Sequence, residues 1–253
     1  MKILQADQVL GKLLRLPKTL IPRNKSVRIL RGPLRGRHWL TGAGPEGWWL
    51  GLSEQDKLKF VSDIIRPGGV FYDIGANVGL YSILAAEKIG ATGRVISFEP
   101  ASRNCSFFRK HMEMNEVLNV DLLQIAIGDK DGEASFDDDG DPVGFRVAAA
   151  GKSRVQMRSL DSMVSTNELP PPSYLKIDVE GAELQVLQGA SSIIKTHRPD
   201  IFIETHNRFV PGVHEDCSNW LSQHGYHVRE FGSDDPKTEI FATASKTNNS
   251  ATV

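Results

Sequence analysis

VFYDIGANVGLYSILAA, residues 70–86, combines a short apolar run, a glycine loop and a helical run in immediate succession. The apolar run ends in Asp73, which is typical of a buried strand. Gly75 and Gly79 allow a tight turn and let the backbone lie against a ligand without a Cβ in between. The alanine- and leucine-rich run from Leu80 favours a helix. The stretch therefore predicts a strand–loop–helix unit that carries a ligand-binding loop.

The spacing within the loop indicates the ligand. Gly75, Asn77 and Gly79 form G-x-N-x-G, whereas a dinucleotide loop follows G-x-G-x-x-G and presents a helix N-terminus to phosphates. S-adenosylmethionine has no phosphate and carries an α-amino group and a sulfonium cation. We expect Asp73 to accept from that amino group and Asn77 to offer its amide to the carboxylate or to the loop. The alternative is a plain strand–turn–helix with Asp73 as a cap, but the combined context favours the cofactor.

The next two strands supply the rest of the predicted cofactor pocket. RVISFEP ends in Glu99, about twenty residues after the loop, which is the separation at which an acid binds ribose hydroxyls in this class of fold. A carboxylate accepts from both hydroxyls at once, and Pro100 then ends the strand. The third strand is expected to pass the adenine, with Gln124 as an edge contact and Ala126 as part of an apolar wall. Core packing is the alternative for Ala126.

Alternation of strands and helices predicts the fold class. We expect a mostly parallel, doubly wound, Rossmann-like α/β sheet with right-handed crossovers and helices on both faces. A closing antiparallel hairpin and a polar insertion between residues 128 and 160 complete it. The expected strands are 70–73, 94–99, 120–125, 133–137, 154–160, 174–178, 200–204, 226–231 and 239–244, and the expected helices are 53–65 (with Ser53 as cap), 80–89, 102–114, 182–195 and 214–224.

Six motifs follow one another along the chain: DIGANVGLYS, FEP, AIGDKDGEASF, SLDSM, LKIDVEGAE and IETH. In this order they resemble the FkbM-type family of S-adenosylmethionine-dependent methyltransferases, from about Leu52 to the closing hairpin. The glycine loop and LKIDVEGAE together are specific, and the first fifty residues carry none of the motifs. The resemblance implies a class I methyltransferase sheet and O-methylation of a sugar, glycolipid or natural-product hydroxyl. It leaves the acceptor open.

The fourth strand delivers two carboxylates to the predicted site. Methyl transfer from a sulfonium needs the acceptor oxygen to be aligned and water excluded, and a poorly nucleophilic alcohol also benefits from a general base. Asp178 ends the strand and Glu180 follows two residues later, so pleating would turn both toward the methyl group if the strand continues that far. We expect Asp178 to act both in catalysis and in the cofactor pocket, and Glu180 in catalysis. Glu183 is expected only to open the next helix and complement its dipole.

The fifth strand ends in Glu204 and, two residues on, His206. A histidine here suits removal of a hydroxyl proton near neutral pH, and a merely hydrogen-bonded or exposed side chain is the alternative. A Mg²⁺ site at Asp178, Glu204 and His206 stays open, but spacing shows no convergence, so no metal ligands are predicted. The other histidines show no ligand spacing and are expected at the surface, among them His38, His111, His197 and His214.

The first forty residues are basic, with ten Lys and Arg against one acid, although the whole chain has a net charge of −1. Apolar residues within 1–16 have near-helical spacing, and 27–52 alternates short runs with glycine turns, which predicts a β-hairpin. We divide the chain into a basic extension (1–52), a catalytic domain (53–245) and a flexible tail (246–253). Trp39, Trp48 and Trp49 are expected to hold the hairpin to the sheet; a lid or a stacking surface for a sugar is the alternative.

Composition also limits the compartment and the partners. Cys105 and Cys217 form neither a disulfide framework nor a metal-site spacing, and no signal peptide or membrane-length apolar run is present, so a cytoplasmic protein is expected. The expected partner is a small-molecule or glycan hydroxyl acceptor. The basic N-terminus leaves peripheral membrane contact open, and the oligomeric state is undetermined. A nucleic-acid methyltransferase using the basic arm is disfavoured because acids dominate the rest of the chain. A binding protein without turnover is disfavoured by the intact Asp73, Glu99 and Asp178.

Overall fold

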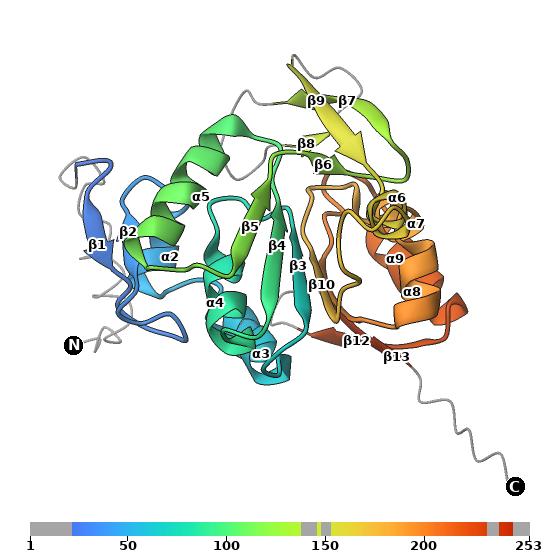
Figure 1. The fold of residues 1–253 in the computed structure, drawn as a ribbon, viewed down its shortest axis with the longest axis horizontal. Coiled ribbons are helices and arrows are strands. Elements are labelled where there is room, and N and C mark those ends of the chain that lie inside the picture. The colour runs from blue at the N-terminus through green and yellow to red at the C-terminus, as the bar shows by residue number, and fades with distance from the viewer. Residues whose placement is uncertain (1–21, 138–145, 148–152, 232–237, 245–253) are drawn as a thin grey trace, which may run out of the picture.

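A seven-stranded, mostly parallel sheet forms the centre of the protein (Figure 1). The computed structural model describes residues 22–137, 146–147, 153–231 and 238–244. The strand order is β12-β13-β11-β10-β3-β4-β5, in which β13 pairs antiparallel with both β12 and β11 and the remaining neighbours are parallel. The strands are β3 (Val70–Ile74), β4 (Arg94–Phe98), β5 (Val120–Leu123), β10 (Tyr174–Ile177), β11 (Asp200–Glu204), β12 (Tyr226–Phe231) and β13 (Glu239–Ala244). The predicted Rossmann-like sheet and closing hairpin are confirmed.

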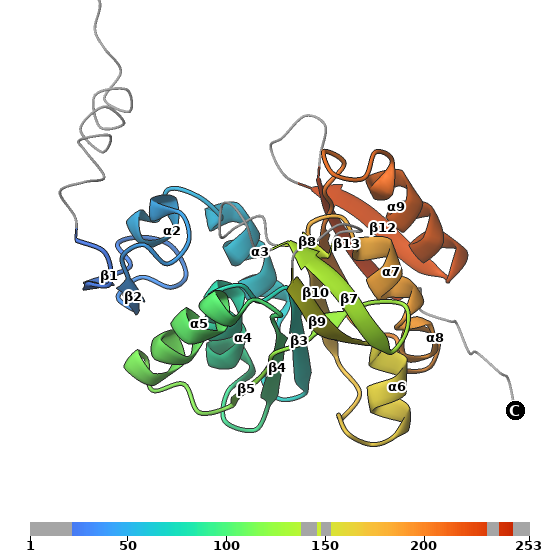
Figure 2. The ribbon, with the colours of Figure 1, turned by 90° about the horizontal axis from the view of Figure 1, so that it is seen from above.

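Helices cover both faces of the sheet, as predicted (Figure 2). One face carries α3 (Gln55–Ile64), α4 (Leu80–Ile89) and α5 (Ser102–Met114), and the other carries α6 (Leu160–Ser165), α7 (Glu183–Gln188), α8 (Ser191–His197) and α9 (Val213–Gln223). The apolar side chains form two buried clusters, one between each helical layer and the sheet. Among the described helices, none has the length and apolar character needed to cross a membrane.

Some helix boundaries differ from the sequence expectation. The single helix predicted over 182–195 is two helices, because the chain turns at Gly189, where a Cβ would lie 2.0 Å from the Gly128 carbonyl oxygen. Asp161 restarts the helix by accepting from the backbone N–H groups of Ser192 and Ile193. The predicted cap of α3 is also wrong, because Glu54 occupies that position with a φ of 63° and no side-chain cap is present.

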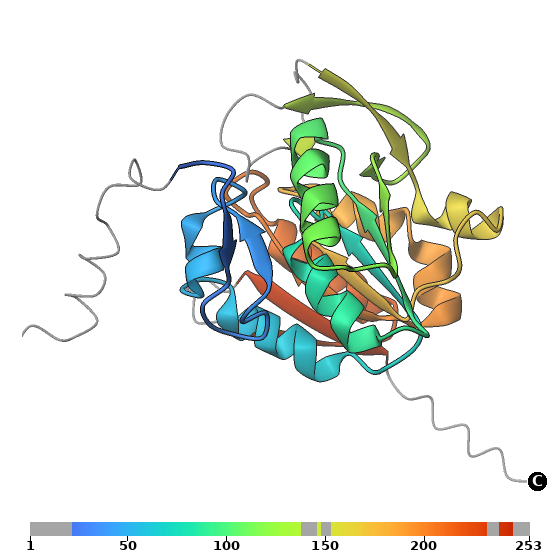
Figure 3. The same cartoon turned by 60° about the vertical axis from the view of Figure 1, so that its left-hand side comes forward.

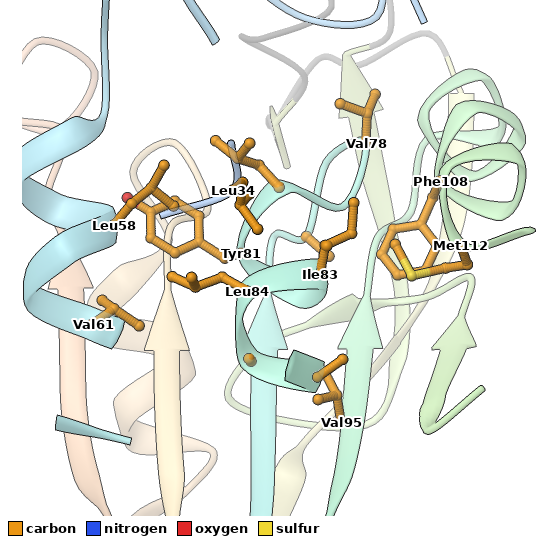
Figure 4. Packing of buried hydrophobic residues seen from close by; sticks show 14 of the residues in the cluster. Leu34, Leu58, Val61, Val78, Tyr81, Ile83, Leu84, Val95, Phe108 and Met112 are labelled. Carbon is orange, nitrogen blue, oxygen red and sulfur yellow. The ribbon is translucent and has the colours of Figure 1, made fainter. Parts of the chain in front are cut away.

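The N-terminal segment belongs to the same apolar core as α4. Its strands β1 (Ser26–Arg28) and β2 (His38–Leu40) pair as the predicted antiparallel hairpin, and α2 (Glu46–Leu50) follows. Figure 3 shows this hairpin beside α5. Leu34 packs in the same cluster as Leu84, Phe108 and Met112 (Figure 4). The expected helix within 1–16 and the tail lie outside the described residues.

A small second sheet follows the carboxyl end of β5. It consists of β6 (Ala126–Ile127), β7 (Gly132–Asp137), β8 (Arg146–Val147) and β9 (Ser153–Arg158), in the order β6-β9-β7-β8. Strands β7 and β9 lie in the polar insertion where the sequence predicts them, whereas β6, which precedes the insertion, and β8 are not predicted. Strand β6 borders the site described next, because Ala126 and Ile127 line the cavity.

Candidate active site

One cavity opens at the carboxyl ends of the parallel strands, where β3 and β10 lie side by side although their paired residues are 103 positions apart in the sequence. This is the point where the strand order reverses, the usual ligand position in an open α/β sheet. The cavity contains about 960 Å³ of empty space, part of it open to solvent. Its lining includes the glycine-loop residues Gly75 and Asn77, Glu99, and the side chains of Asp178, Glu180 and His206.

The glycine loop has the conformation that its sequence predicts. Gly75 has a φ of 76°, and a Cβ there would lie 1.8 Å from the carbonyl oxygen of Asp178, so only glycine fits. The amides of Gly75 and Ala76 both donate to the Phe98 carbonyl at 3.0 Å, which ties the loop to β4. Gly79, at φ 96°, starts α4 and packs near Phe108 rather than lining the cavity.

Glu99 lines the cavity and is held by backbone donors on both sides. Its two carboxylate oxygens accept from the N–H groups of Asn77 and Ala101, each at 2.8 Å. Its side chain is almost fully buried, and burial raises the pKa of Glu99 to about 7 despite these hydrogen bonds. The Asn104 side chain also hydrogen-bonds the Glu99 carboxylate, which leaves its remaining lone pair for a ligand hydroxyl. Asn77 has a left-handed backbone (φ 50°), a conformation that asparagine tolerates well.

Asp73 lies next to the cavity but does not line it. It is fully buried, accepts from the Ser82 hydroxyl at 2.5 Å and lies 3.3 Å from the Lys176 ammonium nitrogen. The structure therefore gives Asp73 internal partners, and the direct cofactor contact that the sequence predicts stays a prediction. Lys176, which the sequence analysis overlooks, also donates to the Gly75 carbonyl at 3.0 Å and lies 3.3 Å from Asp178. This buried cation links the loop to both acids.

Only some of the residues that were predicted to surround the adenine line the cavity. Pro100, Ala126 and Ile127 line it. Gln124 is exposed and donates to the Ser102 hydroxyl at 2.7 Å, outside the cavity lining. Gln124 follows the end of β5 at Leu123, and its hydrogen bond to Ser102 on α5 holds the side chain away from the cavity.

The four predicted catalytic side chains all line the same cavity: Asp178, Glu180, Glu204 and His206. The pleating argument for Glu180 is wrong, because β10 ends at Ile177 and Glu180 is in a left-handed turn with a φ of 57°. That turn, rather than an extended strand, brings the Glu180 carboxylate to within 3.5 Å of the His206 ring.

His206 is surrounded by three carboxylates. Its Nδ1 lies 2.7 Å from Glu183 Oε1, and its Nε2 lies 3.6 Å from Asp178 Oδ1 and 3.5 Å from Glu180 Oε2. Burial lowers the pKa of His206, but these acids outweigh burial and raise it to about 9. Burial raises the pKa of Asp178, yet the Lys176 and His206 cations hold it below its ordinary value. Glu183 is fully buried, so the sequence expectation of a helix-opening acid misses its contact with His206.

Two charged side chains at the start of α3, Glu54 and Lys57, connect this helix to the site. The Lys57 ammonium lies 2.9 Å from Glu204 and 3.0 Å from Glu239, and Glu54 accepts from the Tyr81 hydroxyl at 2.8 Å. Burial and the charge of Asp178 raise the pKa of Glu204 to about 7. No sequence motif marks Lys57 or Glu54, because both lie upstream of the motif set.

The tryptophan cluster separates into two roles. Trp39 is fully buried and stacks on His111, as the expected packing role requires. Trp48 is half-buried, packs against Trp39 in an edge-on arrangement and lines the cavity.

Two histidines that the sequence analysis places at the surface, His111 and His214, are buried in the structure. His111 lies between Val78 and Leu40, and His214 contacts Thr205.

The strand order and the position of the cavity are those of a class I, S-adenosylmethionine-dependent methyltransferase fold. The solved structure of methyltransferase FkbM from Methylobacillus flagellatus KT is similar, with a TM-score of 0.51 and 16% sequence identity. The similarity covers 78% of this chain and 53% of that one. Residues 73–228, more than half of the chain, match the family described as the Methyltransferase FkbM domain, and the chain belongs to this family.

Two curated relatives are similar in sequence. Hexuronic acid methyltransferase AglP of Haloferax volcanii is 27% identical over 149 residues, which is 56% of this chain and 59% of that protein. Methyltransferase 1 of Beauveria bassiana is 28% identical over 141 residues, 46% of this chain and 56% of that protein. The chain thus spans a little over half the length of both relatives. The matched family region leaves out Trp48, Glu54 and Lys57.

Proposed function

We propose that the protein is an S-adenosylmethionine-dependent O-methyltransferase acting on a hydroxyl of a sugar, glycolipid or natural product. The observation that carries this proposal is the single cavity that joins the glycine loop and Glu99 to Asp178, Glu204 and His206. A cofactor held at the first group would direct its methyl group toward the second. Membership of the FkbM family supports the same reaction class.

The residues present fit S-adenosylmethionine, which supplies an electrophilic methyl group when bound. Glu99 would hold the ribose hydroxyls, because both of its oxygens are fixed in the cavity by backbone donors. Gly75 lets the loop pack against the Asp178 carbonyl at the edge of the cavity, and Ala126 would form a wall for the adenine. The cavity is rich in carboxylates, which suits a cationic ligand. Asp73 would act through Lys176 and the loop rather than by direct contact.

At the acceptor end, the chain's own side chains would orient a hydroxyl and take its proton. Asp178 and Glu204 present carboxylate oxygens to the cavity, and such oxygens both accept a hydroxyl hydrogen bond and remove the proton. Glu180 and His206 would keep Asp178 in place, because His206 lies between the two carboxylates. A bound cofactor and acceptor would fill the cavity and exclude water from the reacting oxygen.

A sugar ring suits the remaining wall of the cavity. Trp48 offers an aromatic face of the kind that covers the apolar side of a sugar, and Glu54 and Glu204 lie nearby as hydroxyl acceptors. The relative AglP is named for hexuronic acid methylation, which favours a glycan acceptor for this chain as well. Since Trp48 and Glu54 lie outside the matched family region, they would determine the acceptor preference of this particular protein.

Transfer of a labelled methyl group onto panels of glycosides, uronic acids, glycolipids and polyketide alcohols tests the proposal. We expect incorporation into a hydroxyl compound, and Asp178→Asn to lower turnover more than cofactor affinity. Glu99→Ala should weaken cofactor binding in calorimetry, whereas Glu215→Ala at an exposed position of α9 should not. Label that appears only in nucleic acid, or no cofactor binding at all, would contradict the proposal.

A further inference from the structure

One imidazole nitrogen and two carboxylate oxygens meet at the acceptor end of the cavity. His206 Nε2 lies 3.6 Å from Asp178 Oδ1 and 3.5 Å from Glu180 Oε2, and the three ligand atoms lie within 4.8 Å of one another. Both contacts are longer than a good N–H···O hydrogen bond. Two ligands bound to one ion at about 2.1 Å lie roughly 3.0–3.4 Å apart in octahedral or tetrahedral geometry. The spacing is therefore closer to that of a shared ion than to that of direct hydrogen bonds.

The orientation of the His206 ring also suits metal ligation. Its Nδ1 lies 2.7 Å from Oε1 of Glu183, which is fully buried and therefore fixes the ring. A bound ion would displace the proton of Nε2, while Nδ1 would keep its proton for Glu183, so Nε2 is the nitrogen that would ligate. Metal-binding histidines commonly donate their other nitrogen to such a carboxylate, which orients the ring and raises its basicity. Among the described residues, Glu183 Oε2 has no hydrogen-bond partner, so this buried acid adds negative charge beside the ring that is only partly compensated.

The neighbouring cations leave the ligand oxygens accessible. Lys176 approaches Asp178 at Oδ2, 3.3 Å away, while Oδ1 is the oxygen that faces His206. Arg208 lies 3.3 Å from Glu180 Oε2, but 66% of its side chain is exposed, so it can move away when an ion binds. An ion at this point would be held by one oxygen of each acid.

We propose that Asp178, Glu180 and His206 bind one divalent cation of the Mn²⁺ or Zn²⁺ class. One imidazole and two carboxylates suit these ions better than Mg²⁺ or Ca²⁺, which favour oxygen ligands alone. All three side chains line the cavity, so the ion would keep a coordination position open to it. Binding of the ion is independent of the proposed function. Its use, to hold the acceptor hydroxyl and lower the pKa of that hydroxyl, rests on the proposed function.

Titration of the EDTA-treated full chain with MnCl₂, followed by the electron paramagnetic resonance signal of free Mn²⁺, tests the site. We expect saturable binding of one ion per chain, weakened at least about tenfold by Glu180→Gln and by His206→Gln. Glu183→Gln should weaken binding about 10- to 100-fold through the ring orientation. The matched control, Glu215→Gln at an exposed position of α9, should bind Mn²⁺ like the wild type.

Binding of S-adenosylhomocysteine without metal reports on folding and on the cofactor pocket in the same samples. Glu180→Gln serves as the second variant if His206→Gln fails to fold. The metal proposal is overturned if neither Mn²⁺ nor Zn²⁺ binds saturably, or if both variants bind them like the wild type. Methyl transfer that persists in EDTA, without metal binding, would reject the ion and leave the proposed function standing. Saturable metal binding without methylation of any hydroxyl acceptor would support the ion and contradict the proposed function.

Discussion

His111 should make the stability of this protein sensitive to mild acid. Its Nε2 accepts from the backbone N–H of Leu40 at 3.0 Å, its Nδ1 contacts the Val78 carbonyl at 2.8 Å, and its ring stacks on Trp39. The histidine therefore joins the N-terminal hairpin to the glycine loop. A second proton on the ring would place two N–H groups, those of Leu40 and of Nε2, against each other, so the buried site requires neutral imidazole.

The magnitude follows from the pKa difference between the folded and unfolded chains. Burial lowers the pKa of His111 from 6.5 to about 4, and the bond to Val78 offsets only part of this. The unfolded chain therefore binds more protons between pH 6.5 and 4, so stability is fully present above pH 6.5 and is lost as the pH falls through this window. The full effect is about 3 kcal/mol, of which about 2 kcal/mol is expected between pH 7.5 and pH 5.0.

Urea unfolding, monitored by tryptophan fluorescence at pH 7.5 and pH 5.0, measures this loss. His111→Gln removes the titrating group, so the variant should lose about 2 kcal/mol less than the wild type between the two pH values, whatever its stability at pH 7.5. His227→Gln is the control, because His227 is exposed. If wild type and His111→Gln lose the same free energy of unfolding between these pH values, the assignment of acid sensitivity to His111 is wrong.

Three further variants test how the cavity is built. Gly75→Ala should lower the free energy of unfolding by about 2–5 kcal/mol and abolish cofactor binding, because its Cβ would meet the Asp178 carbonyl. The control Gly212→Ala has open space around the added Cβ and should lower that free energy by only about 1 kcal/mol, so equal losses in the two variants would contradict the reasoning. Lys57→Met should destabilise by about 3–5 kcal/mol in urea unfolding, because it leaves buried carboxylates uncompensated, whereas the exposed Lys59→Met should cost less than about 1 kcal/mol. Trp48→Ala should raise the acceptor KM at least about tenfold while leaving the cofactor Kd unchanged in calorimetry; an unchanged KM would remove Trp48 from acceptor binding.

Local sequence patterns were sufficient for the order and type of most elements. Strand and helix runs, glycine positions and strand-end acids depend on a few neighbouring residues, and this is why the parallel sheet, the closing hairpin and the glycine loop were predictable. The same local view fails where a distant segment intervenes. The helix after the fourth strand divides at Gly189 because the backbone of Gly128 lies against it, and no property of the helix sequence reveals that neighbour.

The features of the site also fall into those that the sequence determines and those that the folded structure determines. The sequence alone places acids at the ends of β4, β10 and β11, because each acid directly follows or ends an apolar run. Which side chains meet was decided by the folded structure. Lys57 pairs with Glu204, 147 positions further along the chain, and Glu183 contacts His206. Asp73 lies against Lys176 and does not line the cavity. Side-chain contacts of this kind depend on how separate strands and helices are brought into register, and that three-dimensional arrangement has no signature in the spacing of residues along the chain.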